Sequence, residues 1–264
     1  MYSFNYHRPL SLKEAAQFLS AAPEGKLLSG GMTLIPTLKQ RLASPSDVID
    51  LSGIADLSGI SEKGGALVIG ATTTHAEVAA SKVVMSKIPA LAALAESIGD
   101  PQVRNRGTIG GSVANNDPAA DYPAGVLGLG ATVKTDRREI TADDYFKGLF
   151  ETALEEGEII TAISFPIPKK AGYAKFPNPA SRYAVVGVMA SQGPAGTRVA
   201  VTGAGPGVFR VAAMEKALGG NFSASAIEGI SLPAKGLNAD IHASAEYRAH
   251  LIGVMARRAV AAAG

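Results

Sequence analysis

Apolar residues recur at helical spacing just after an early pair of glycines. Within residues 34–42, leucine and isoleucine stand three or four positions apart, which is typical of one buried face of a helix. Thr33 can cap the N-terminus of this helix, and Pro36 is tolerated in a first helical turn. Residues 26–28, before the glycines, indicate the end of a short strand. The glycine pair therefore lies between a strand and the start of a helix.

The same periodicities predict elements along the rest of the chain. Further helices are expected at residues 11–19, 75–80, 89–98, 118–127, 142–146, 212–218 and 244–263. Further strands are expected at residues 4–6, 48–51, 66–69, 131–134, 158–165, 183–190 and 197–202. A segment rich in proline and glycine, residues 166–179, interrupts this pattern and predicts a boundary between two domains.

A second glycine pair lies in Arg104–Asp117, a stretch with two arginines and few large apolar side chains, which we interpret as a glycine-rich loop. Bare backbone at Gly110 and Gly111 can adopt left-handed angles and approach a ligand closely. Successive N–H groups in such a loop suit a phosphate, and the arginines add positive potential. Two such loops, about eighty positions apart, can clamp a pyrophosphate, although each alone is also compatible with an ordinary turn.

Composition matters mainly for what it excludes. The chain has 264 residues, of which 47% are hydrophobic and 18% charged, with a formal net charge of +2. These values are typical of a globular protein and too balanced for a general nucleic-acid binder. No apolar run approaches the ~18–20 residues of a membrane span, and residues 1–12 lack a signal-peptide core, so we expect a cytoplasmic protein without a membrane span. The absence of cysteine excludes cysteine-ligated iron–sulfur clusters and cysteine nucleophiles within this chain.

Several familiar chemistries find no motif in the sequence. It contains no G-x-G-x-x-G, no G-x-x-x-x-G-K-[ST], no H-E-x-x-H and no G-x-S-x-G. The four scattered histidines, which predict no metal site, are His7, His75, His242 and His250. Asp100, Asp117 and Asp121 flank the second glycine pair, where capping of the loop and hydrogen bonding to a hydroxyl-rich ligand are favoured over paired acid–base work.

Longer motifs give the chain a resemblance to a known family. Asp100–Gly111 contains the string Arg-Asn-Arg-Gly-Thr-Ile-Gly-Gly and is followed by Asp117-Pro118 and then Asp121. Ser29–Thr33 is similar to a loop usually written Ala-Gly-Gly-His/Gln-Ser/Thr. Shorter matches are at residues 69–74, 201–205 and 246–251. On these motifs the chain resembles, nearly end to end, the medium, FAD-binding subunit of the molybdenum hydroxylases, a family that includes carbon monoxide dehydrogenase and xanthine dehydrogenase.

The resemblance implies a fold. It implies an α+β FAD-binding domain of the PCMH type, in which two subdomains enclose the cofactor, followed by a smaller C-terminal domain with a three-stranded antiparallel sheet and helices. On this basis we assign residues 1–170 to the FAD-binding domain, with subdomains of about 1–60 and 61–170, and residues 175–264 to the C-terminal domain. The boundary predicted within 166–179 agrees with this division.

The resemblance also implies which residues hold FAD. The matching positions are Ser29, Gly30, Gly31, Met32, Thr33, Leu34, Thr108, Ile109, Gly110, Gly111, Ser112, Asp121, Ile160, Lys175 and Tyr183. Residues 29–34 and 108–112 would hold the pyrophosphate, and Asp121 would accept hydrogen bonds from the ribityl or ribose part. Met32 replaces a usually polar residue, and Ser112 stands where Asn or Asp is common, which leaves FAD binding as a class intact.

The ring systems of FAD have fewer assigned neighbours. By resemblance, Ile159 or Ile160 would line the adenine or flavin pocket. Tyr183 falls where the family often places an aromatic residue near the isoalloxazine, although it is also compatible with a core tyrosine that starts a strand. Lys175 is a further candidate. No catalytic acid or base and no metal ligand is expected in this chain.

The implied activity is electron transfer. In the family, a large subunit oxidises the substrate at a molybdenum cofactor, and a small subunit relays electrons through two [2Fe–2S] clusters. The FAD of the medium subunit passes these electrons to an external acceptor, which can be NAD, quinone or dioxygen. The lack of cysteine agrees with clusters carried by another chain, and the expected assembly is a heterohexamer with two copies each of the large, medium and small subunits.

Two other functions stay open on the residues alone. One is a self-contained FAD-dependent oxidase or reductase of a small molecule. The other is a nucleotide-binding or assembly module without enzymatic activity. Bound flavin would exclude the second, and turnover by the isolated chain would favour the first.

Overall fold

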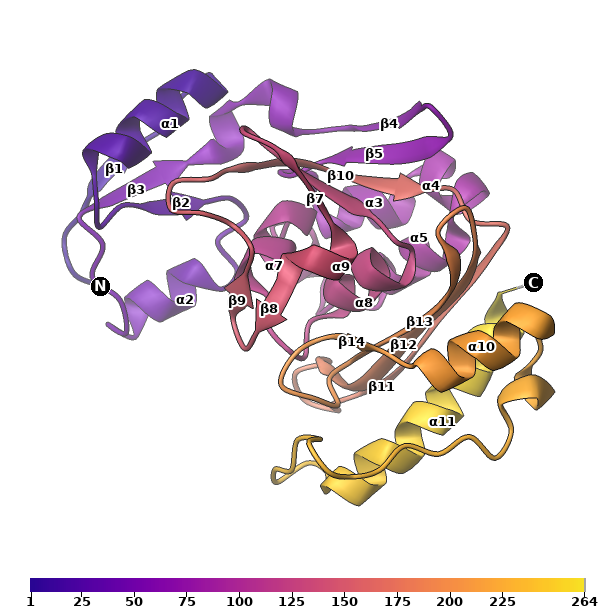
Figure 1. The fold of residues 1–264 in the computed structure, drawn as a ribbon. Coiled ribbons are helices and arrows are strands. Elements are labelled where there is room, and N and C mark those ends of the chain that lie inside the picture. The colour runs from indigo at the N-terminus through magenta and orange to yellow at the C-terminus, as the bar shows by residue number, and fades with distance from the viewer. Residues whose placement is uncertain (264) are drawn as a thin grey trace.

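The computed structural model describes residues 1–263 and arranges them around three sheets and one short hairpin (Figure 1). A three-stranded sheet contains the N-terminal strands, a five-stranded sheet spans the middle, and a four-stranded sheet belongs to the C-terminal part. Gly264, the last residue of the expected C-terminal domain, lies outside the described residues.

The first sheet is parallel, with the strand order β1-β3-β2. Its strands are β1 (Asn5–His7), β2 (Lys26–Leu28) and β3 (Asp47–Asp50), and its connecting helices are α1 (Leu12–Ala21) and α2 (Leu34–Lys39). Parallel strands need a crossover, and the two helices supply it. Thr33 occupies the N-cap position of α2, as predicted, but its side chain makes no capping hydrogen bond.

The second sheet is antiparallel, with the strand order β4-β5-β10-β6-β7. Its strands are β4 (Ile60–Lys63), β5 (Ala66–Gly70), β6 (Thr132–Thr135), β7 (Glu139–Thr141) and β10 (Ile160–Pro166). The central strand β10 alternates buried and half-buried positions, and Ile163 and Phe165 are fully buried. Ile163 lies opposite Ile69 of β5 and Val133 of β6, which places an apolar row across the sheet.

A group of short helices packs beside this sheet. They are α3 (His75–Ala80), α4 (Lys82–Lys87), α5 (Pro89–Glu96), α6 (Pro101–Arg104), α7 (Ile109–Asn115), α8 (Asp121–Gly128) and α9 (Ala142–Tyr145). Every residue of α8 is buried, because α5 and α7 contact it from the N-terminal part and strands β12 and β13 of the C-terminal sheet contact it as well. The hairpin of β8 (Phe146–Gly148) and β9 (Glu151–Thr152) follows α9.

The predicted loop at Arg104–Asp117 is wrong in its middle, where α7 forms. Asp100 caps α6 by accepting the Val103 N–H at 2.9 Å, and Thr108 caps α7 by accepting the Gly111 N–H at 3.1 Å. The glycine pair therefore occupies a first helical turn, and neither Gly110 nor Gly111 has a positive φ. Glycine has a low helix propensity, so the sequence indicates a loop where burial of Ile109 and Val113 selects a helix.

The C-terminal part has a four-stranded sheet, so the expected three strands are corrected to four. The strands, in spatial order, are β11 (Lys170–Pro177), β12 (Ala184–Gly193), β13 (Gly196–Thr202) and β14 (Phe209–Arg210). The fourth strand is only two residues long and pairs with Ala200 and Val201, and such a short edge strand leaves no alternating pattern to detect. Helix α11 (Ala245–Ala262) packs on β11 and β12, and α10 (Ala212–Gly220) packs on β13.

Helix α11 approaches the sheet at Gly172 of β11. A Cβ built on Gly172 would collide with the carbonyl oxygen of Ala259, so the helix and the strand meet backbone to backbone. None of the helices in residues 1–263 combines the length and the apolar character that crossing a bilayer requires.

We expect Gly172→Ala to destabilise the chain because the added methyl forces α11 away from β11. Overpacking of this kind costs about 1–3 kcal/mol of the free energy of unfolding. Urea denaturation measures it, and Gly220→Ala is the matched control, because a Cβ there meets no atom within 4 Å. Equal stabilities of the two variants would mean that the helix and the strand can separate without loss.

Candidate functional site

A cleft of about 690 Å³ lies between the β2–α2 loop, the start of α7 and the loop that precedes β12. Its volume falls within the range of ~300–1,000 Å³ that is usual for ligand and cofactor sites. We call two groups of its lining residues, which come from different elements, the first and the second end. Leu27, Leu51 and Ile159 share one apolar cluster at the first end, and Arg182 donates to the Gly99 carbonyl at 3.3 Å at the second end.

The β2–α2 loop supplies free backbone donors to the middle of the cleft. Within the part of the chain that the structure describes, the N–H groups of Gly30, Gly31, Met32 and Thr33 donate to no protein acceptor. Gly31 has a φ of 75°, a left-handed angle that glycine adopts without strain. Unpaired backbone donors in one concavity suit an oxyanion.

The loop is held against the Arg106–Gly107 segment by close backbone contact. A Cβ on Gly30 would collide with the carbonyl group of Arg106 and lie 2.8 Å from Cα of Gly107. The hydroxyls of Ser29 and Thr108 are hydrogen-bonded at 2.8 Å. Gly30 is therefore required by packing between the two glycine segments, which sequence alone does not distinguish from a turn.

The backbone of the second glycine segment has a different role from the one predicted. The Ile109 N–H donates to the Thr73 carbonyl at 3.1 Å, and the Gly110 N–H donates to the Ala71 carbonyl at 2.9 Å. The Gly111 N–H donates to the hydroxyl of the N-cap Thr108, and the Ser112 N–H donates to its carbonyl. These donors are thus occupied, and the segment offers the cleft a bare surface and two hydroxyls, those of Thr108 and Ser112, rather than a second row of free N–H groups.

Asp121 lies at the first residue of α8 and faces the cleft, but most of its carboxylate is engaged within the protein. Only 4% of Asp121 is exposed. It accepts a hydrogen bond from the Tyr173 hydroxyl and another from Lys175 Nζ at 3.0 Å, while Lys175 also donates to the Ser97 carbonyl at 2.8 Å. Burial raises the pKa of the Asp121 carboxyl, and the Lys175 ammonium opposes that rise.

Tyr183 stands at the second end of the cleft, just before β12, and 46% of it is exposed. The interpretation as a core tyrosine is therefore wrong, because a core side chain would be covered. Partial burial of the hydroxyl, together with the nearby Asp117 and Asp121 carboxylates, raises the pKa of the Tyr183 phenol. An aromatic ring with an open face beside a cleft is suited to stacking on a planar ligand.

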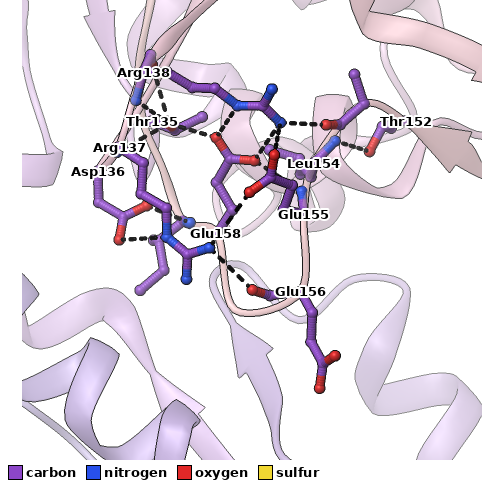
Figure 2. A network of polar contacts seen from close by, with 11 residues as sticks. Thr135, Asp136, Arg137, Arg138, Thr152, Leu154, Glu155, Glu156 and Glu158 are labelled. Atoms are coloured by element: carbon purple, nitrogen blue, oxygen red, sulfur yellow. Dashed lines mark hydrogen bonds and ion pairs between the residues drawn. The ribbon is translucent and has the colours of Figure 1, made fainter.

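The first end of the cleft is walled by Leu154, Ile159 and Ile160, with Glu158 among them. Figure 2 shows that Glu158 lies at the centre of a polar network with Arg138 and Thr135. The Arg138 guanidinium holds the pKa of the Glu158 carboxyl well below its usual range, at about 2. The carboxylate is therefore charged throughout the neutral range.

The structure brings most of the predicted site residues together. Thirteen of the fifteen line the cleft: Ser29, Gly30, Gly31, Met32, Thr33, Leu34, Thr108, Gly110, Gly111, Ser112, Asp121, Ile160 and Tyr183. Ile109 faces the apolar core instead, because helical spacing turns it inward. Lys175 lies behind Asp121 and reaches the cleft only through that carboxylate.

The sequence interpretation missed several residues of the cleft. The missed side chains are Lys26, Leu51, His75, Ile98, Leu154, Glu158 and Arg182. They come from separate elements and share no spacing, so a local pattern does not find them. Only His75 has a local signal in the sequence. It follows Thr74, whose side chain forms a capping box with Glu77, so the sequence marks His75 as the first residue of α3.

His75 is a buried, neutral imidazole at the side of the cleft. It is 5% exposed, and its ring centroid lies 5.3 Å from that of Tyr122. Its Nδ1 has no hydrogen-bond partner among the described residues. Burial, aided by the charge of Arg104, lowers the pKa of His75 to about 4.

Comparison with known proteins identifies the family. The family model described as "FAD binding domain in molybdopterin dehydrogenase" matches residues 2–168, more than half of the chain. The chain belongs to the FAD-binding medium subunits of the molybdenum hydroxylases. It is thus the flavoprotein medium chain of an oxidoreductase complex.

The relatives match this medium subunit over almost its whole length. The nicotine 6-hydroxylase medium subunit of Paenarthrobacter nicotinovorans is 37% identical, with 99% of this chain and 98% of the relative covered. The carbon monoxide dehydrogenase medium chain of Afipia carboxidovorans is 38% identical, with 98% and 96% covered. Among solved structures, reconstituted CO dehydrogenase from Oligotropha carboxidovorans aligns with a TM-score of 0.90 at 35% identity, covering 99% of this chain and 98% of the other.

We expect the buried His75 to make the apo subunit less stable as the pH falls. Its pKa in the folded chain lies below the usual 6.5, so between pH 6.5 and 4 the unfolded chain binds a proton that the folded chain does not. Stability should fall by about 3 kcal/mol across this window because of His75. Chemical denaturation at several pH values should show a smaller loss in His75→Gln. The exposed His250→Gln is the control, and identical pH profiles for both variants would show that folding does not lower the pKa of His75.

Proposed function

We propose that this medium subunit holds one FAD in the cleft and is the last electron carrier of its complex. When bound, FAD would supply the step that takes electrons from [2Fe–2S] clusters of a partner subunit and delivers them to an external acceptor. The row of unpaired N–H groups at Gly30–Thr33, set in a cleft of sufficient size, is the observation that supports this most directly.

The residues of the cleft fit FAD in three parts. The N–H groups of the β2–α2 loop would bind the pyrophosphate, and the Thr108 and Ser112 hydroxyls face the same space. Asp121 keeps acceptor capacity on each carboxylate oxygen and would accept hydrogen bonds from cofactor hydroxyls. The apolar end and the Tyr183 end would each take one ring system, with the isoalloxazine at Tyr183 by resemblance.

The partners follow from what this chain does not contain. The sequence has no cysteine, so [2Fe–2S] clusters would be carried by a small partner subunit. The molybdenum cofactor and the organic substrate would bind a large subunit. One solved relative is described as a CO dehydrogenase that lacks the Mo-pyranopterin moiety of its molybdenum cofactor. We infer a heterohexamer with two copies of each of the three subunits.

The experiment that tests this function combines flavin analysis with electron transfer. The purified subunit should bind about one FAD, and acid precipitation should release it, because no cysteine offers a covalent link. Alone, it should oxidise no aldehyde, purine or other N-heterocycle. Mixed anaerobically with its reduced iron–sulfur and molybdenum partners, it should lose its flavin absorbance band.

Three results would contradict the proposal in different ways. FMN in the acid supernatant would contradict the assignment of the β2–α2 loop to a pyrophosphate, because FMN has only one phosphate. Colour left in the pellet would mean a covalent flavin. Turnover of an organic substrate by the isolated chain would support a self-contained oxidase in place of an electron-transfer subunit.

We expect Gly30→Ala to abolish or strongly weaken FAD binding. The added methyl has no space beside the Arg106 carbonyl, so the loop and its unpaired N–H groups must move. Titration of the apo subunit with FAD, followed by flavin fluorescence, measures the dissociation constant. Gly207→Ala is the matched control, since the nearest atom to a Cβ there is 3.9 Å away. Full FAD occupancy in Gly30→Ala would show that the loop does not hold the cofactor.

A further inference from the structure

Glu158 is a charged side chain buried in the wall of the cleft. It lies in the segment between β9 and β10, and its side chain is 0% exposed. Its Oε1 accepts from the Thr135 hydroxyl at 2.7 Å and from Arg138 Nε at 3.0 Å. Its Oε2 accepts from Arg138 Nη2 at 2.9 Å and from the Glu155 N–H at 2.8 Å (Figure 2). All four distances lie within the usual range for hydrogen bonds, and two of the bonds form a fork with one guanidinium.

The same network fixes both ends of the segment 153–159. Arg138 Nη2 also donates to the Ala153 carbonyl at 2.7 Å. At the other end, the backbone of Ile159 is held by Asp136, which receives the Ile159 N–H on its carboxylate at 2.9 Å and donates its own N–H to the Ile159 carbonyl at 2.9 Å. The turn between β6 and β7 thus acts as a clamp on the segment.

The clamped segment forms the apolar end of the cleft. Leu154, Ile159 and Ile160 line it, and Ile159 packs in one cluster with Leu27 and Leu51 of the first sheet. The segment has no regular secondary structure of its own between β9 and β10. Its position therefore depends on the contacts that hold it: the Glu158–Arg138 pair, Asp136 at Ile159, the Arg137 bond to the Glu156 carbonyl and the bond of the Ala153 N–H to the Tyr145 carbonyl.

We propose that the Glu158–Arg138 pair is a positioning element that sets the affinity for FAD by holding the wall of Leu154, Ile159 and Ile160 in place. The inference rests on the proposed function, because it assumes that a ring system of FAD occupies this end. Neither residue of the pair needs to touch the cofactor. The pair acts through the wall, and its loss lets the wall move.

The charges around Glu158 decide what happens when the pair is broken. Arg138, Arg137 and Asp136 come from the β6–β7 turn, and Glu155 comes from the segment itself. The Tyr145 phenol of α9 is affected by the Glu158 charge, which adds to burial in raising the tyrosine pKa. Arg137 lies 3.9 Å from the Asp136 and Glu155 carboxylates, and its Nη1 donates to the Glu156 carbonyl of the segment at 3.2 Å. Without Arg138, the buried carboxylate keeps hydrogen bonds but loses its cation, so it should take up a proton more readily.

The test compares Arg138→Met, Glu158→Gln and the double variant with Lys134→Met as the matched control, because Lys134 is a cation of the same hairpin that pairs with the exposed Glu139. At pH 7.5, Arg138→Met should weaken FAD binding by about tenfold, because an uncompensated buried charge displaces the wall. The double variant should bind FAD no more weakly than Arg138→Met, and Lys134→Met should stay close to the native affinity. Arg138→Lys keeps a cation but cannot form the fork, so its affinity for FAD should lie between those of the native subunit and of Arg138→Met.

A pH series separates positioning from general loss of structure. In Arg138→Met, FAD affinity should improve as the pH falls from 7.5 to 5, because protonation of Glu158 relieves the unpaired charge. The native subunit and the double variant should lack this improvement. A lower melting temperature with native FAD affinity in Arg138→Met or Arg138→Lys would show that the pair only stabilises the fold. If the native subunit itself binds no FAD, the proposed function fails and the inference fails with it, which is distinct from failure of the variants alone.

Discussion

The backbone contact between Gly30 and the Arg106–Gly107 segment is the constraint on which the cleft depends. It joins two parts of the chain that are far apart in sequence, and it leaves no space for a side chain. The hydrogen bond between Ser29 and Thr108 fixes the same junction from the side. The loop lines the cleft, and the N–H groups of residues 30–33 have no acceptor among the described residues. The position of these unpaired donors thus depends on the packing at Gly30.

The C-terminal sheet is the second support of the cleft, and it is joined to the FAD-binding part by polar contacts at residues 118–121. Thr202 donates its hydroxyl to the Pro118 and Ala120 carbonyls at 3.0 and 2.7 Å, and the Gly203 N–H donates to Pro118 at 2.8 Å. Lys175 and Tyr173 reach Asp121 from β11. A buried carboxylate without these partners would be costly, so the two parts stabilise each other. This junction brings Tyr183 to the second end of the cleft.

The motifs and the structure agree on where the site lies and differ on how its parts work. The two glycine pairs look alike in sequence, yet only Gly31 takes a left-handed angle. A Cβ built on Gly110 would lie 2.6 Å from Ala71. One pair presents free donors, and the other allows a helix to approach a strand. The domain boundary within 166–179 stays a prediction, and β11 begins inside it, at Lys170.

The sequence by itself indicated the family, most of the elements and the two glycine segments that line the cleft, because these depend on local motifs and on hydrophobic period. Tertiary structure alone decided which N–H groups are free, since each depends on an acceptor far along the chain, as Gly110 depends on Ala71. It also decided that Ile109 turns inward, that Lys175 acts on Asp121, and that Glu158 lies beside the cleft. These are relations between residues separated by many positions, and short-range spacing carries no information about them.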